Sequence, residues 1–325
     1  MTVGEDGAIR ALDLNGSVSA AFSLGTRAIS ARITANAKRI VIDGAVWDAS
    51  ASRLLHRYQF DSVFSPDATR VLTLTKDNIG QVRETENGRL IGTLAGHMCP
   101  KPFTNAHFSP NNMLIVAPIC NEEDESVQPF RVWDANDGRV LTMLTLPKGK
   151  LFLREEPFSP DGKLIVTGSL NGTYSERIWY ARTGRQLTSM LPYNRGIFIP
   201  DAIFSPNGRL IATSADNGTV LVWDAHNGHL VSSLAADSGF GDVKFSPNSK
   251  RILTVSEDSI ELWDADTGIL VNTLPKTGNI GSSRFSPDGK RIITVDRGGT
   301  ARIYIVGFDE LLKRAKQHLP IERGK

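Results

Sequence analysis

The chain has 325 residues, enough for two average domains or for one large all-β domain, so its length alone does not choose between them. Acidic and basic residues are scattered along the whole chain and leave a net charge of +2, which gives no reason to expect nucleic acid or a membrane surface as a partner. No signal peptide opens the sequence, no apolar run reaches the ~18 residues of a membrane helix, and only Cys99 and Cys120 occur, so we expect a cytoplasmic protein without a disulfide framework.

One short motif recurs along the chain. Pro favours the second position of a type I turn, Asp or Asn is tolerated at the third and Gly suits the fourth, as in Ser205-Pro206-Asn207-Gly208. The motif therefore predicts a chain reversal once in roughly every 40 to 50 residues. Phe-Ser-Pro-Asp or Phe-Ser-Pro-Asn begins at six positions, and a weaker copy makes seven: Phe64, Phe108, Phe158, Phe204, Phe245, Phe285 and the weaker Ile33.

A second motif follows each of these turns. All five tryptophans of the chain hold one position in it, most of them followed by Asp, whereas Arg83 and Tyr304 stand there in two degenerate copies. Such regular placement predicts a structural role for the tryptophans, with Trp223 buried between repeats. The five are Trp47, Trp133, Trp179, Trp223 and Trp263.

Short strands are predicted around both motifs. Segments such as "RLIATSA" and "TVLVWDA" are rich in β-branched residues and bounded by Gly, Asn and Asp. One repeat therefore predicts a four-stranded antiparallel sheet of roughly 40 residues that is apolar on both faces. A sheet of this kind cannot bury both faces alone, and stacking copies around an axis solves that problem.

The period, the Ser-Pro-Asp-Gly turn and the Trp-Asp pair resemble the tryptophan-aspartate (WD) repeat of β-propellers, over about residues 1 to 306. The resemblance implies an all-β, seven-bladed β-propeller of four-stranded antiparallel blades at residues 17–306. It also implies a platform that binds a protein or peptide partner. The chain departs from the family pattern where Arg83 replaces the tryptophan, and only one Gly-His pair, Gly96-His97, is present.

Both ends of the chain fall outside the seven complete copies. Residues 1–16 align with residues 253–268, so we expect a partial repeat displaced from the ring. The strand at 17–22 is expected to pair with the strand at 301–306 and close the ring, because that pairing buries more apolar surface. Residues 307–325 predict a C-terminal amphipathic helix and tail. The tail resembles the helical endings of bacterial WD-repeat regions, which implies the C-terminal part of a larger protein.

Large side chains occupy the loops that lead into the inner strands, where small polar residues are usual. Aromatic and Arg residues are enriched in interface hot spots, so these loops are the candidate partner-binding surface. The alternative is that the same side chains fold back over the blades as local core. The candidates are Phe103, Phe152, Tyr193, Arg195, Phe198 and Phe240.

A polar residue stands three positions before the repeated Phe in most copies. If the inner strands line a central channel, these residues form a polar ring at its mouth that could seat a cation or a basic peptide. The other interpretation is that they cap the backbone where each inner strand begins. They are Asp61, Asn105, Glu155, Asp201 and Asp242.

The sequence favours a binding function over catalysis. No nucleophile, base and orienting group are recognisable together, and Cys99, His107 and Cys120 do not have a common zinc spacing. We expect a non-enzymatic scaffold or ligand-sensing propeller without cofactor or metal, a monomer or part of a larger chain. Two alternatives stay open: the sensor region of a larger bacterial signalling ATPase, protease or kinase, and an enzyme with a site in the central channel.

Overall fold

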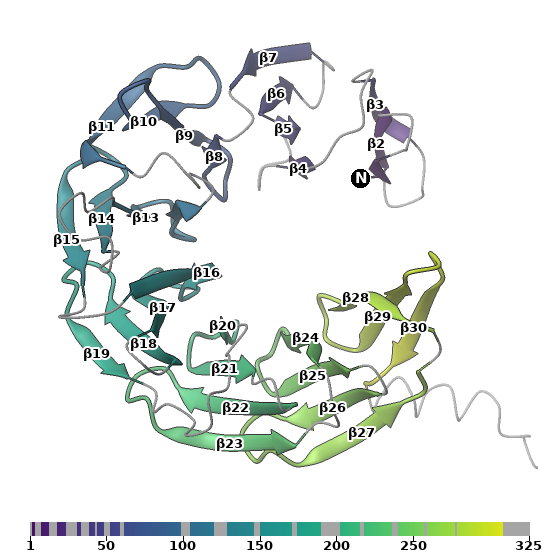
Figure 1. Ribbon diagram of the computed structural model, residues 1–325. Helices are drawn as coiled ribbons and strands as arrows, with labels where there is room; N and C mark the ends of the chain where they lie inside the picture. The colour runs from purple at the N-terminus through teal and green to yellow at the C-terminus, as the bar shows by residue number, and fades with distance from the viewer. Residues whose placement is uncertain are drawn as a thin grey trace, which may run out of the picture. The chain divides into compact units, whose positions relative to one another are not determined.

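The computed structural model shows a chain built from strands and turns (Figure 1). It falls into two compact units. The first contains residues 1–165 and 179–185, and the second contains residues 166–178 and 186–325. The residues that the structure describes are 2–3, 8–12, 18–23, 31–33, 39–42, 44–48, 53–58, 62–98, 105–119, 129–145, 150–170, 174–189, 202–214, 218–235, 240–256, 259–276 and 278–307.

The first unit begins with a three-stranded sheet and continues with four-stranded sheets whose strands follow chain order or its reverse. The three-stranded sheet contains β1 (Thr2–Val3), β2 (Ala8–Leu12) and β3 (Val18–Ser23). The next contains β4 (Ala31–Ile33), β5 (Arg39–Ile42), β6 (Ala45–Asp48) and β7 (Arg53–Arg57). It is followed by β8 (Val63–Phe64), β9 (Arg70–Leu74), β10 (Ile79–Glu84) and β11 (Leu90–His97), and then by β12 (His107–Phe108), β13 (Leu114–Pro118), β14 (Phe130–Asp134) and β15 (Val140–Leu144).

Four more sheets follow in chain order. The first of them contains β16 (Lys150–Phe158), β17 (Leu164–Leu170), β18 (Tyr174–Tyr180) and β19 (Gln186–Ser189). The next two contain β20 (Ala202–Phe204), β21 (Leu210–Ser214), β22 (Thr219–Asp224) and β23 (Leu230–Ala235), and β24 (Phe240–Phe245), β25 (Arg251–Ser256), β26 (Ile260–Asp264) and β27 (Leu270–Leu274). The last contains β28 (Ile280–Phe285), β29 (Arg291–Asp296) and β30 (Ala301–Ile305).

The Phe-Ser-Pro motif forms the predicted turn between the first two strands of a sheet. In all six copies the Ser hydroxyl donates to the Oδ1 atom of the Asp or Asn two residues later, at 2.5 to 2.8 Å. The backbone N–H five residues after the Ser donates back to the same hydroxyl, at 2.9 to 3.0 Å. These bonds satisfy backbone groups that the reversal would otherwise leave unpaired.

The fourth residue of each of these turns has a positive φ. Gly adopts this conformation without a steric penalty, but three of the six turns have another residue there. The six are Ala68, Asn112, Gly162, Gly208, Ser249 and Gly289.

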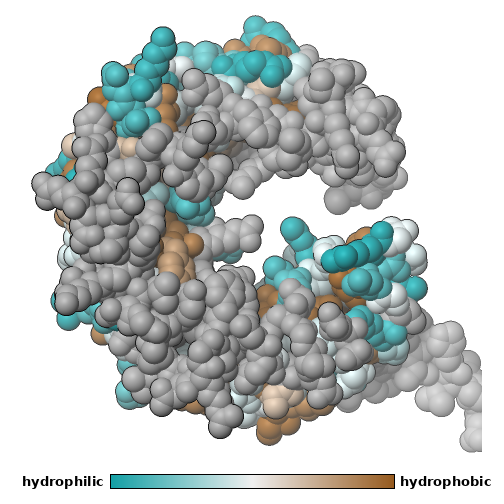
Figure 2. Space-filling view, in the orientation of Figure 1, coloured by the Kyte–Doolittle hydropathy of each residue, from teal (hydrophilic) through white to brown (hydrophobic). Residues whose placement is uncertain are grey.

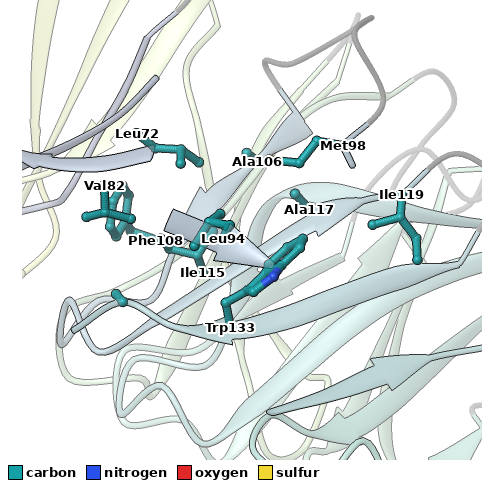
Figure 3. Packing of buried hydrophobic residues seen from close by; sticks show 11 residues of the cluster. Leu72, Val82, Leu94, Met98, Ala106, Phe108, Ile115, Ala117, Ile119 and Trp133 are labelled. Atoms are coloured by element: carbon teal, nitrogen blue, oxygen red, sulfur yellow. The ribbon is translucent and has the colours of Figure 1, made fainter. Parts of the chain in front are cut away.

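The core consists of apolar clusters that join neighbouring sheets. One cluster brings Leu72 and Leu94 of sheet β8–β11 together with Ile115 and Trp133 of sheet β12–β15, and Figure 3 shows these side chains at close range. Trp133 is fully buried, and its Nε1 atom donates to the carbonyl of Ala95 at 3.1 Å. The predicted burial of Trp223 is confirmed, because only 8% of it is exposed.

Several sequence predictions are confirmed in part. The described elements are all strands, and among the described residues seven sheets run from β4 to β30, as the seven turn copies predicted. The last sheet lacks the fourth strand, also as predicted. The helix predicted for residues 307–325 lies outside the described residues except for Gly307, which is not helical.

The predicted closing strand is wrong. β3 pairs with β2, with Arg10 opposite Ala21, so residues 8–12 occupy the edge that was expected to receive residues 301–306. Among the described strands, β30 pairs with β29. The reason is entropic: only residues 13–17 separate β2 from β3, whereas pairing β3 with β30 would close a loop of nearly the whole chain.

Candidate functional site

Neighbouring sheets meet at joints in which the fourth strand of one sheet packs against the turn after the third strand of the next. At four joints a Cβ atom added to the turn glycine would come closer than a side chain allows, so the backbones approach tightly. The pairs in contact are Gly138 with Thr93, Gly184 with Thr142, Gly228 with Thr188, and Gly268 with Ser233.

The joint between sheets β4–β7 and β8–β11 differs in its fourth-strand residue. In three other sheets, the Val that precedes the tryptophan position faces a small residue on the fourth strand. These small residues are Gly92, Thr142 and Ser232. In sheet β4–β7 this residue is His56, opposite Val46. A Cβ at Gly88 would meet the His56 ring only at an ordinary contact distance of 3.4 Å. The imidazole therefore holds the turn of the next sheet away.

The same joint also lacks a tryptophan. Arg83 lies on β10 opposite Val71 and Leu90, just after a shift in the strand register. Trp133 has the equivalent pairing on β14, opposite Ile115 and Val140. The side chain of Arg83 thus stands where an indole ring would fill the joint.

These two replacements leave a cavity of about 390 Å³. Its size falls within the range of about 300 to 1,000 Å³ that is usual for small-molecule sites. Its lining residues come from β7, β9, β10 and the turns that follow them. They are His56, Arg57, Tyr58, Thr73, Leu74, Thr75, Gln81, Arg83, Asn87 and Gly88.

Hydrogen bonds fix the position of Arg83 in this cavity. Its Nη1 atom donates to the carbonyl of Gly88 at 2.9 Å, and its Nη2 atom donates to Oε1 of Gln81 at 2.6 Å. Gln81 and Arg83 are two residues apart on one strand, so they project from the same face of the sheet. The guanidinium is therefore held in place by its own sheet.

Tyr58 is the buried residue of the cavity lining. Its hydroxyl donates to the carbonyls of Glu84 and Thr85 at 2.8 and 3.1 Å, and its ring lies 4.4 Å from that of His56. Burial raises the pKa of Tyr58 to about 12, although the Arg83 charge acts in the opposite direction. The phenol is therefore neutral at physiological pH and serves as a hydrogen-bond donor that ties the two sheets together.

The structure describes only some of the predicted loop residues. Phe152 is half-buried in β16, and Phe240 begins β24 opposite Ser256. Phe103, Tyr193, Arg195 and Phe198 lie outside the described residues. The proposed partner-binding surface thus stays a prediction.

The predicted polar ring is also described only in part. Asn105 is exposed just before β12, Glu155 lies in β16, and Asp61 and Asp201 lie outside the described residues. The Asp242 carboxylate accepts a hydrogen bond from Ser283 and forms an ion pair of 3.0 Å with Lys244. Its role as a seat for a cation or a basic peptide stays a prediction.

An exposed apolar run begins at the residue before β27, the outermost strand of sheet β24–β27, and continues into that strand. Ile269, Leu270 and Val271 are 65%, 43% and 46% exposed. Figure 2 shows hydrophobic side chains at the lower edge of the view, where Figure 1 places β27. Consecutive exposed apolar residues on an edge strand favour contact with another protein surface.

Sequence reasoning missed both the cavity and this run. The signals were present, because Arg83 interrupts the series of tryptophans and "GILV" at 268–271 places three apolar residues in succession. In the part of the chain that the structure describes, no three His, Cys, Asp or Glu side chains gather as metal ligands would. The described residues also contain no helix with the length and apolar character needed to cross a bilayer.

Comparison with known proteins finds matches to WD40 repeats between residues 196 and 304. The family model described as WD domain, G-beta repeat, matches residues 196–224, 225–264 and 268–304. No curated protein matches the chain.

Solved structures resemble the chain over most of its length. A structure described as the eukaryotic initiation factor is 16% identical with a TM-score of 0.71, covering 89% of this chain and 78% of its own. The C-terminal WD40 domain of Sif2 is 11% identical with a TM-score of 0.65, and the computationally designed Ika8 protein is 17% identical with a TM-score of 0.58. Both comparisons cover 93% of this chain and 91% of the other. At such low identity the likeness shows the fold and leaves the function open.

Proposed function

We propose that this protein is a non-enzymatic WD-repeat module that binds a protein partner. The three WD40 repeats and the likeness to a WD40 domain support the class of protein. Sheets that are locked together at tight joints make a rigid support for binding residues on loops and edges. The proposal also includes a ring of seven sheets, supported by the seven turn copies, and a cytoplasmic location, supported by the two-cysteine composition.

The observation that carries this proposal is the exposed apolar run at residues 269–271. A strand at the edge of a sheet has unpaired backbone groups, and soluble proteins usually protect such edges with charged side chains. Here Ile269 and Leu270 follow the turn with their side chains in solvent. Covering them with a partner would remove apolar surface from water.

The test compares partner recovery by tagged, full-length variants after chemical crosslinking in cells. One variant is Ile269→Ser with Val271→Ser. A second is Phe152→Ala with Phe240→Ala, two residues that were expected in loops and that lie in β16 and β24. Met113→Ser is the matched control, because Met113 is 51% exposed in a turn of another sheet.

We expect the Ile269 and Val271 variant to lose most of the recovered partner while its far-ultraviolet circular dichroism stays unchanged. A loss confined to the Phe152 and Phe240 variant would move the binding surface to the inner-strand loops. If every variant recovered the partner as the control does, neither surface would be the binding surface.

A further inference from the structure

The cavity beside Arg83 has an excess of basic groups. Two arginines and one histidine belong to its lining, together with residues that carry hydroxyl and amide groups, and none of the described lining residues is Asp or Glu. Opposite charge is attracted to a concave surface of this kind more strongly than to a flat one. The basic groups belong to His56, Arg57 and Arg83, and the neutral polar ones to Thr73, Thr75, Gln81 and Asn87.

The carboxylates of the adjacent turn are already paired with other groups. Glu84 forms an ion pair with Arg89 and accepts a hydrogen bond of 2.8 Å from Asn87. Glu86 forms an ion pair of 2.5 Å with Arg39. Because these acidic groups are neutralised outside the cavity, the charge of Arg83 is not cancelled by its own turn.

Arg83 is oriented to receive an anion. Its bonds to Gly88 and Gln81 use two of the five N–H donors of a guanidinium group. The remaining donors of this planar group can bond the oxygen atoms of a phosphate group. Since the side chain is already fixed, binding would cost little additional side-chain entropy.

We infer that this cavity binds the phosphate group of a phosphate monoester. Two arginines, Arg57 and Arg83, belong to the lining, and a charge of +2 matches a dianion better than a single carboxylate. The cavity volume of about 390 Å³ has room for a small ester around that group. Thr75 also lies in the lining, and its hydroxyl accepts a hydrogen bond of 3.2 Å from the Ile79 N–H, which leaves the hydroxyl hydrogen as a further donor. This site shares no residue with the surfaces proposed for a protein partner.

Isothermal titration calorimetry on the full chain tests the inference, with inorganic phosphate and O-phosphoserine as probes and acetate and serine as controls. We expect both phosphates to bind and both controls to fail. Arg83→Gln and Arg57→Gln should each weaken phosphate binding by about tenfold or more. Arg53→Gln is the matched control for Arg57→Gln. Arg53 lies on β7, as Arg57 does, and carries the same charge, but it is not part of the cavity lining.

The variant Arg83→Trp tests whether phosphate binding can be lost without loss of folding. This variant restores the residue that the other sheets have and fills the cavity, so binding should disappear while the melting temperature stays the same or rises. Unchanged phosphate binding in this variant or in Arg83→Gln would overturn the inference, as would acetate binding as tightly as phosphate.

A phosphoserine peptide distinguishes two sources of the same group. Equal affinity for the peptide and for O-phosphoserine would support a free phosphate ester as ligand. Tighter binding of the peptide, lost in Arg83→Gln, would support a phosphorylated protein segment.

Discussion

The hydroxyl of Ser283 donates a hydrogen bond of 2.9 Å to the carboxylate of Asp242, and this bond joins the first strands of two neighbouring sheets. Figure 1 shows these strands, β24 and β28, side by side. Ser283 is buried, whereas Asp242 is part-exposed and also pairs with Lys244. A polar residue on a first strand can therefore connect one sheet to the next.

Ser283→Ala should lower the free energy of unfolding by about 0.5 to 1.5 kcal/mol, because it removes one hydrogen bond and leaves an acceptor of Asp242 unpaired. Urea denaturation gives the value, and a double-mutant cycle with Asp242→Ala isolates the pair. Ser282→Ala is the control, since Ser282 is the exposed neighbour on the same strand. If Ser283→Ala and Ser282→Ala lowered the free energy of unfolding equally, the hydrogen bond between Ser283 and Asp242 would not contribute to stability.

Asp161→Asn should make the protein less sensitive to acid. Burial would raise the pKa of Asp161, but hydrogen bonds from the Ser159 hydroxyl and the Lys163 N–H outweigh it and lower that pKa below its ordinary value. A carboxyl group with a lowered pKa stabilises the fold above its unfolded pKa of about 3.9, and this contribution is lost as the pH falls through the folded pKa.

Melting temperatures measured between about pH 7 and pH 3 check this prediction. The variant should lose less than about 1 kcal/mol at neutral pH, because Asn207 makes the same bonds in an equivalent turn. Its stability should then fall less steeply than that of the wild type below about pH 4. Parallel curves for the two proteins would count against a role for the Asp161 carboxylate.

Ala68→Gly should stabilise the protein by about 0.5 to 1 kcal/mol, because Ala68 has a φ of 51° in a region that disfavours a Cβ atom. Ser249→Gly relieves the same strain, at a φ of 62°, but removes the hydroxyl that accepts a hydrogen bond of 3.0 Å from the Asn207 N–H. Its gain should therefore be smaller. Differential scanning calorimetry measures both, and a destabilised Ala68→Gly would show that the lost methyl packing outweighs the strain.

Trp223→Ala should cost about 3 to 5 kcal/mol, the range for removing a large buried aromatic side chain. Trp223→Phe keeps most of the packing but loses the hydrogen bond of 2.8 Å from Nε1 to the Thr213 hydroxyl, so its cost should be smaller. Chemical denaturation measures both variants. A cost below about 1 kcal/mol for Trp223→Ala would mean that the tryptophans do not hold the repeat together.

The repeat could be predicted from the sequence because its determinants are local. The Ser-Pro-Asn turn at Ser205 needs only neighbours within five residues, and the chain reverses there as the motif predicts. The position of Trp223 on a third strand follows from the same period. Local rules of this kind act on each copy separately.

The remaining features depend on residues that are distant in sequence. The cavity requires His56 on one sheet and Arg83 on the next. In the sequence, each of these residues alone only marks its repeat as a degenerate copy. β2 and the strand at residues 301–306 were both candidates for the same edge of β3. β2 occupies it, and its connection to β3 has the smaller entropic cost of loop closure. A single sequence does not show the outcome of either.

The cavity also has a mechanical consequence. In a linear array of repeats, stability is shared between each unit and its contacts with the next, so the array opens most readily where those contacts are fewest. The joint held by Tyr58 has a solvent-open pocket beside Arg83, whereas Trp133 fills the following joint, so it lacks the dispersion contacts of an indole ring. Amide protons of β5 and β6 should accordingly exchange with solvent through a smaller opening free energy than those of β13 and β14, and this joint would then separate two cooperative folding units.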